Sequence, residues 1–124
     1  MENDYEFHEE NKNQKPPFNC HMSRYLIPVQ ETDNIHIQLM KQLIGARGKY
    51  FIHLTKDGRL RYLWYDKETK SIDIWGQEAK IPKCIKKIEL KIYKILNKMY
   101  QQEHELKPET IQWMEGYTQN FKKF

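Results

Sequence analysis

Long hydrophobic runs are missing from this chain. In 124 residues no apolar stretch approaches the roughly 18 residues that a membrane-spanning helix needs, so we expect no membrane contact. The first residues, Met-Glu-Asn-Asp-Tyr-Glu, are acidic and lack the apolar core of a secretory signal. The chain has only two cysteines, Cys20 and Cys84, which are too far apart for a Cys-x-x-Cys motif. These absences predict an intracellular protein, cytoplasmic or nuclear, with reduced thiols.

Recognisable catalytic and metal-binding patterns are also absent. The five histidines do not fall at zinc-ligand spacing, and Gln102-Glu103-His104-Glu105 is not the His-Glu-x-x-His of metalloproteases. The sequence contains neither a Gly-x-Ser-x-Gly motif nor a P-loop lysine. We therefore expect a protein that is not an enzyme and has no catalytic residues, metal or cofactor. A catalytic cluster that only folding brings together stays open at this point.

The net charge of +4 hides a strong partition along the chain. Residues 35–100 carry fifteen basic and six acidic side chains, a net charge of +9. The flanking segments 1–34 and 101–124 have net charges of −4 and −1. A basic centre of this kind is the electrostatic footprint of an anionic partner. A merely solubilising surface has the same composition, so charge alone does not decide between the two.

A glycine-rich turn interrupts the apolar pattern at residues 44–49, Ile-Gly-Ala-Arg-Gly-Lys. Glycine has no Cβ, so Gly45 and Gly48 allow a sharp turn and a close approach to a ligand. Backbone N–H groups at a helix start, flanked by Arg47 and Lys49, suit the phosphates of a nucleic acid. Taken alone, the motif is weak, because a helix that ends at a glycine before a tight turn has the same sequence.

Periodicity predicts an alternation of short strands and helices after a polar segment, residues 1–22, which we expect to be disordered. The longest helix shows a stripe of seven apolar positions from Ile81 to Met99, with Cys84 as a small core residue. Its lysines lie mainly off that stripe, which is typical of a solvated face. The expected strands are 24–29, 60–65 and 71–75. The first helix is expected to follow a cap at Asp33 or Asn34 and to end before Gly45, and the other expected helices are 49–56, 81–100 and 109–123.

This order of elements, with Gly45 and Gly48 at the junction of the first two helices, resembles a type I KH domain. The resemblance covers roughly residues 24–100. An aliphatic residue precedes the first glycine, apolar residues follow the second, a glycine ends the strand pair, and the last helix has a buried face. The residues at these positions are Ile44, Phe51, Leu54, Ile72, Ile74, Gly76, Ile85, Ile88 and Ile92.

The resemblance implies an α+β fold of type I KH-like βααββα order. A three-stranded antiparallel sheet carries three helices on one face, and an extra C-terminal helix follows. It also implies a groove between the first two helices and the second strand, which holds about four nucleotides of single-stranded RNA or DNA. By family habit the ligand is RNA more often than DNA. Members with acidic residues inside the loop do not bind, whereas Ala46-Arg47 is compatible with binding.

The implied binding residues have three roles. The glycine turn approaches the backbone, three cations contact phosphates, and apolar side chains form the floor under the bases. The strand contributes either Leu60 or Tyr62 to that floor, because the segment after Leu54 is about one residue shorter than in the family. The full set is Lys41, Ile44, Gly45, Ala46, Arg47, Gly48, Lys49, Ile52, Leu60 and Tyr62. Two or three phosphate contacts predict a shallow salt dependence, with a log–log slope of roughly −1.4 to −2.

The sequence thus divides into a tail (1–22), a KH-like domain (23–105) and a C-terminal extension (106–124) with a short helix. That helix can cover the open face of the sheet, extend the preceding helix or make a dimer contact. An alternative function is a KH-like module for protein–protein interaction or homodimerisation without nucleic-acid binding. The excess of lysine over arginine, 17 against 4, and the 60–76 strand pair are similar to KH-like proteins of large DNA viruses, which implies a viral protein in a host cell.

Overall fold

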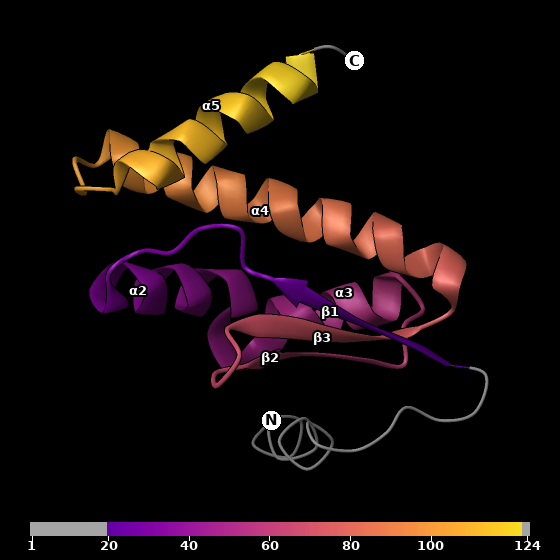
Figure 1. Ribbon diagram of the computed structural model, residues 1–124. Coiled ribbons are helices and arrows are strands. Elements are labelled where there is room, and N and C mark those ends of the chain that lie inside the picture. Colours follow the sequence, from indigo (N-terminus) through magenta and orange to yellow (C-terminus); the bar gives the residue numbers. More distant parts are fainter. Residues whose placement is uncertain (1–19, 123–124) are drawn as a thin grey trace.

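Residues 20–122 are described by a computed structural model, and they form a three-stranded sheet with four α-helices (Figure 1). Two 3-10 turns, Ala46–Gly48 and Glu78–Lys80, introduce the helices that follow them. The elements in chain order are β1 (His21–Leu26), α2 (Asp33–Ile44), α3 (Lys49–Asp57), β2 (Tyr62–Asp66), β3 (Ser71–Gly76), α4 (Ile81–Gln101) and α5 (Pro108–Lys122).

The sheet is antiparallel throughout, with the strand order β1-β3-β2. β3 therefore lies in the centre, and β1 and β2 are edge strands. In the register between β2 and β3, Leu63 pairs with Ile74 and Trp64 pairs with Asp73. Successive side chains of a strand point to opposite faces, so Leu63 and Tyr65 lie on one face of β2 and Tyr62 and Trp64 on the other.

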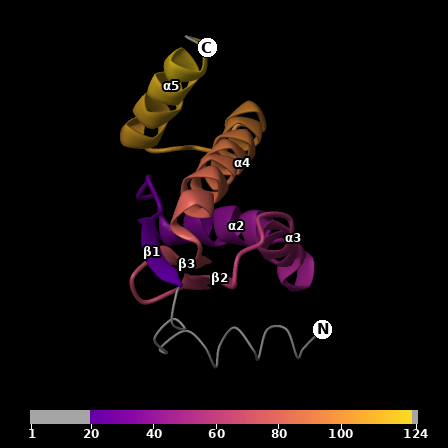
Figure 2. The same ribbon diagram turned by 90° about the vertical axis from the view of Figure 1, so that its right-hand side faces the viewer.

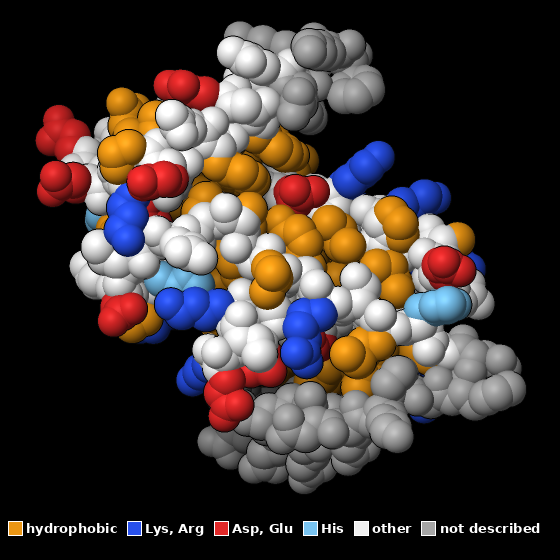
Figure 3. Space-filling view, viewed as in Figure 1, with side chains coloured by type: hydrophobic (Ala, Val, Ile, Leu, Met, Phe, Trp, Pro, Cys, Tyr) orange, Lys and Arg blue, Asp and Glu red, His pale blue; other side chains and the backbone are white. Residues whose placement is uncertain are grey.

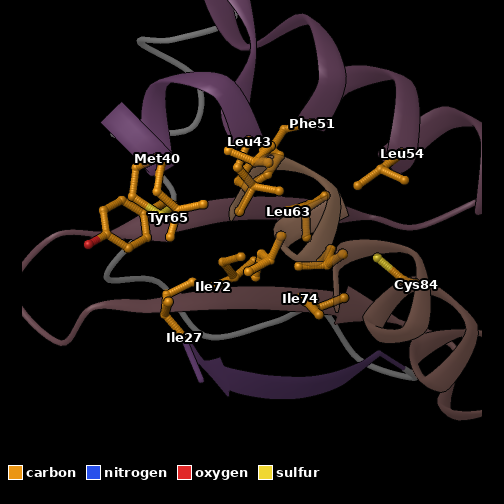
Figure 4. Packing of buried hydrophobic residues seen from close by; sticks show 14 of the residues in the cluster. Ile27, Met40, Leu43, Phe51, Leu54, Leu63, Tyr65, Ile72, Ile74 and Cys84 are labelled. Atoms are coloured by element: carbon orange, nitrogen blue, oxygen red, sulfur yellow. The ribbon is translucent and has the colours of Figure 1, made fainter. Parts of the chain in front are cut away.

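Helices α2, α3 and α4 cover one face of the sheet (Figures 1 and 2). Leu63, Ile72 and Ile74 point from the strands into the layer between sheet and helices, where Leu43 and Phe51 meet them (Figure 4). All five side chains are fully buried. The sequence-based expectation of an α+β fold with a three-stranded antiparallel sheet, three helices and an additional C-terminal helix is confirmed.

The amphipathic pattern of α4 is also confirmed. Ile88, Ile92 and Leu96 have no exposed surface, and Cys84 is buried at 4 % exposure. Burial raises the pKa of the Cys84 thiol to about 11, so this sulfur stays protonated at neutral pH. Both cysteines are free thiols. Within residues 20–122 no helix has the length and apolar character required to cross a membrane.

Helix α5 folds back over α4, on the side of α4 that faces away from the sheet (Figures 1 and 2). Its first turn is held by Glu31, which lies in the connection between β1 and α2. The Glu31 carboxylate accepts hydrogen bonds from the Lys107 backbone N–H, at 2.8 Å, and from the Thr110 hydroxyl, at 2.5 Å. In the described chain this helix therefore neither covers the open face of the sheet nor extends α4, and a dimer contact through it stays a prediction.

Several boundaries differ from those expected from the sequence, most of them by one residue. β1 begins at His21 rather than residue 24 and ends before Pro28, which has no N–H to donate to a strand ladder. Thr32, not Asp33 or Asn34, is the N-cap residue of α2, and its side chain makes no capping bond. β2 starts at Tyr62, two residues later than expected. The predicted disordered tail lies outside the described residues except for its last three, which lead into and begin β1.

Candidate functional site

The glycine turn joins α2 to α3 and has backbone torsions that glycine adopts most readily. Gly45 has φ 84° and ψ 166°, and Gly48 has φ 75°. The Gly48 N–H donates to the Gly45 carbonyl at 3.1 Å, which closes the turn. Between them, Arg47 has a positive φ of 57°, which is uncommon for a residue with a side chain. The turn is therefore a fixed structure, with Ala46 and Arg47 exposed at its tip.

Both glycines also have a steric reason to lack a Cβ. A Cβ on Gly45 would stand 3.0 Å from the backbone nitrogen of Tyr50. A Cβ on Gly48 would stand 3.1 Å from two ring atoms of Trp64. The pattern Gly-x-x-Gly is thus required by the local packing of the protein itself, and its presence does not need a ligand to explain it.

A groove of about 810 Å³ lies beside this turn. One wall is the exposed side of α2 and the turn, and the opposite wall is β2 with the β2–β3 hairpin. Ile37 stands on its rim with 53 % of its surface exposed, although it is a large apolar residue. The lining residues are His36, Ile37, Met40, Lys41, Ile44, Gly45, Ala46, Arg47, Gly48, Trp64, Tyr65, Lys67 and Lys70.

The charge of the groove has one sign. Lys41 and Arg47 lie on the α2 side, and Lys67 and Lys70 lie across from them on the hairpin. None of the residues that line the groove is acidic. Within residues 20–122 none of the three lysines takes part in an ion pair. An apolar trough with cations on both sides attracts a ligand that is itself apolar in the middle and anionic at its edges.

At the end of the groove near the hairpin, His36 and Tyr65 form a buried polar pair. The His36 Nε2 atom and the Tyr65 hydroxyl are 2.6 Å apart. Burial lowers the pKa of His36, and the nearby Lys70 ammonium lowers it further. Burial likewise raises the pKa of Tyr65. At neutral pH the pair is therefore uncharged, and the positive charge of the groove comes from lysine and arginine alone.

The structure brings most of the residues expected at the site together. Lys49 is the first residue of α3 and is exposed, and the partly buried Ile52 lies beside Gly48. Neither of these two residues lines the groove. Leu60 packs against Gly76 instead, and the Tyr62 ring contacts the Trp75 ring with centroids 4.6 Å apart and the planes tilted by 41°. Neither residue lines the groove. The residues that do line it as expected are Lys41, Ile44, Gly45, Ala46, Arg47 and Gly48.

Trp64 and Tyr65 take the place expected for Leu60 or Tyr62. Trp64 belongs to the outer face of the sheet by alternation, yet its indole reaches Gly48 and Phe51 because β2 is an edge strand. The shortening after Leu54 indicated an uncertainty of one residue, but Trp64 and Tyr65 lie at least two positions beyond the residues expected there. For His36, Lys67 and Lys70 no sequence signal existed, since only the folding of the hairpin beside α2 brings them to the groove.

Other chemistry is not gathered in the described part of the chain. Among residues 20–122 no three or more histidine, cysteine, aspartate or glutamate side chains lie close enough together to hold a metal ion. Acidic side chains in this part of the chain form structural ion pairs, such as that between the Asp73 Oδ1 and Arg24 Nε atoms, which are 3.0 Å apart.

No protein-family model, curated protein or solved structure matches this chain. The geometry of the groove is therefore the basis for any statement about function.

Proposed function

We propose that this protein binds single-stranded nucleic acid, RNA more than DNA, in the groove between α2, the glycine turn and β2, in the manner of a type I KH domain. The observation that carries the proposal is the combination of an apolar trough with cations on both walls. Bases fit the trough, and phosphates fit the cations. The order βααββα within the sheet order β1-β3-β2 supports the same assignment.

The groove supports weak and sequence-tolerant binding. Trp64 and Tyr65 line the groove but are only 6 % and 9 % exposed, so a base contacts little of either ring and gains less than the roughly 1–3 kcal/mol of full stacking. Four cations allow at most about four phosphate contacts, which sets a log–log salt slope no steeper than roughly −2.8 for a single strand. We expect dissociation constants of roughly micromolar or weaker for a tetranucleotide, because one small site has little contact area and no avidity.

The decisive experiment places two carboxylates at the tip of the turn. The double variant Ala46→Asp with Arg47→Asp reverses the charge where a phosphate would lie, and aspartate tolerates the positive φ of position 47 better than most residues. We expect the affinity for fluorescent tetranucleotides to fall by more than about tenfold, or about 1.4 kcal/mol, with an unchanged circular dichroism spectrum. Fluorescence anisotropy with RNA and DNA in parallel measures this effect.

A matched control makes the same change in net charge elsewhere. Lys86→Asp with Gln119→Asp alters two exposed side chains, on α4 and α5, that do not line the groove. The control variant should bind like the natural protein. Equal losses in both variants would assign the binding to overall charge, and full affinity in the loop variant would remove the groove from consideration.

A protein-interaction or homodimerisation role is the alternative, and one observation favours it. Met22 and Leu26 are 48 % and 64 % exposed on the edge strand β1, on the face turned away from the helices. Edge strands with exposed apolar residues pair readily with other chains. Light scattering of the full chain decides this alternative: a dimer that Leu26→Lys converts to a monomer, with no oligonucleotide binding in either protein, would support it.

A further inference from the structure

A second concave basic site lies at the other end of α3. It is a pocket of about 280 Å³ between the α3–β2 turn and the first turns of α4. Leu54 and Cys84 contribute its apolar part, and Asp57 is its sole carboxylate. Its complete lining is Leu54, Asp57, Gly58, Arg59, Lys80, Lys83, Cys84 and Lys87.

The charges of this pocket do not balance. Lys87 is held by Asp57, with a Nζ–Oδ2 distance of 2.8 Å. This contact raises the pKa of Lys87 and lowers the pKa of Asp57, so both are charged at neutral pH. Arg59, Lys80 and Lys83 have no ion-pair partner within residues 20–122. The protonated Cys84 thiol supplies no compensating charge. The positive charges of Arg59, Lys80 and Lys83 therefore favour the binding of an anion in the pocket.

A row of lysines connects this pocket to the glycine turn. Lys83, Lys87 and Lys91 are spaced four residues apart on α4 and so lie on one side of the helix, over about 12 Å. The Lys91 Nζ lies 5.0 Å from the centre of the Tyr50 ring, and Tyr50 is the residue that packs against Gly45. The row therefore begins beside the turn and ends in the pocket.

We propose that a strand bound in the groove continues over the glycine turn and along this row, and that the pocket binds one or two of its phosphates. The ligand of the pocket is thus the phosphodiester backbone of the same single strand, and the proposal rests on the proposed function of the groove. Because the cations of the pocket contact phosphates, which every nucleotide carries, the contribution of the pocket depends on the length of the ligand and not on its bases.

The test compares ligands that fit the groove alone with ligands that reach the pocket. Fluorescent 4-mers and 12-mers of uridine and thymidine are titrated with the full chain at several salt concentrations. For the 12-mer we expect a log–log salt slope steeper by about 0.7 for each added phosphate contact. The variant Lys80→Glu with Lys83→Glu should bind the 12-mer at least about tenfold more weakly and the 4-mer within about twofold of the natural protein.

Two further variants sharpen the result. Lys86→Glu with Lys107→Glu makes the same change in net charge at exposed positions that line neither site, and it should leave both ligands unaffected. Asp57→Asn frees Lys87 from its ion pair, and it should tighten binding of the 12-mer but not of the 4-mer. Partial unfolding of the Asp57→Asn variant would weaken binding, so a higher affinity for the 12-mer cannot be an effect of unfolding.

The outcomes separate the two proposals. If the natural protein binds neither ligand, the function proposed for the groove fails and this inference fails with it. If the 4-mer binds but the pocket variants change nothing, or change both lengths equally, only the inference is overturned. Inorganic phosphate can also be titrated by calorimetry. If phosphate binds the pocket while the pocket variants do not change the difference in affinity between the 12-mer and the 4-mer, the pocket is a site for free phosphate and the proposed strand path is overturned.

Discussion

Both sides of this molecule pair aromatic and polar groups, as His36 and Tyr65 do at the groove, but the two sides differ in what they leave exposed. Between α4 and α5 these groups pair with one another: the rings of Tyr93 and Tyr117 are 5.2 Å apart, Trp113 stacks on Tyr117, and the Thr118 hydroxyl donates to the Tyr93 hydroxyl at 2.8 Å. At the groove the apolar Ile37 is left exposed. Figure 3 shows apolar side chains between α5 and the sheet, over α4.

This difference separates a structural contact from a candidate binding surface. On the α5 side the rings of Tyr93, Trp113 and Tyr117 contact one another and the buried Glu31 carboxylate holds the helix through one of its oxygens, so these groups serve internal contacts. The lysines of the groove have no carboxylate partner within residues 20–122, so an anion can bind there without the breaking of an ion pair among these residues. The contrast predicts that changes on the α5 side affect stability alone, whereas changes at the glycine turn affect stability and binding.

The largest effect should come from the second glycine of the turn. Gly48→Val forces a β-branched residue into a positive φ and places its Cβ about 3.1 Å from the Trp64 ring. We expect a loss of about 2–4 kcal/mol in the free energy of unfolding, from left-handed strain and overpacking together. Urea denaturation measures it. A loss below about 0.5 kcal/mol would show that Trp64 does not pack on this glycine.

On the α5 side the largest effect should come from Glu31. Glu31→Ala leaves the Lys107 N–H and the Thr110 hydroxyl without their acceptor, and Thr110 is only 1 % exposed. We expect a loss of about 1–3 kcal/mol, with faster amide exchange across α5. Glu31→Gln keeps an acceptor oxygen and should lose less. Oligonucleotide affinity should stay unchanged in both, and a parallel loss would break the separation of the two sides.

A matched glycine on α5 should respond in the opposite direction. Gly116 lies inside the helix, and a Cβ built on it meets nothing within 4 Å. Gly116→Ala should therefore raise the free energy of unfolding by up to about 1 kcal/mol, because alanine loses less conformational entropy in a helix. Thermal denaturation measures the gain. Destabilisation by this substitution would mean that the exposed side of α5 is covered by a partner.

The smallest effect should come from acidification at the groove. The pKa of His36 is lower in the folded protein than in the unfolded chain because of burial and Lys70, so the unfolded chain takes up the proton first. The contribution of His36 is complete above about pH 6.5 and is lost as the pH falls below that value. Urea denaturation of His36→Gln between pH 7 and pH 6 should show a flatter pH dependence, and an identical slope would exclude His36 as its source.

The elements of this protein were predictable because their signals are local. Each signal lies within a single segment of the sequence. These signals are the seven apolar positions along α4, the alternation of β2 and the two glycines of the turn. Residues whose role depends on an edge or a connection were predicted less well. Leu60 and Tyr62 have the composition of a groove wall but pack elsewhere, because the register of β2 places Trp64 and Tyr65 at the groove.

The sequence by itself determined the fold class, the position of the glycine turn and the basic charge of the segment around it, since these follow from periodicity, from the missing Cβ and from composition. Only the tertiary structure decided which cations share a hollow. Lys67 and Lys70 are more than 20 residues from Lys41 along the chain, and strand pairing is what places the hairpin across the groove from α2. The docking of α5 through Glu31 was settled in the same way, because a buried carboxylate binds the donors that packing brings to it, whatever their separation in sequence.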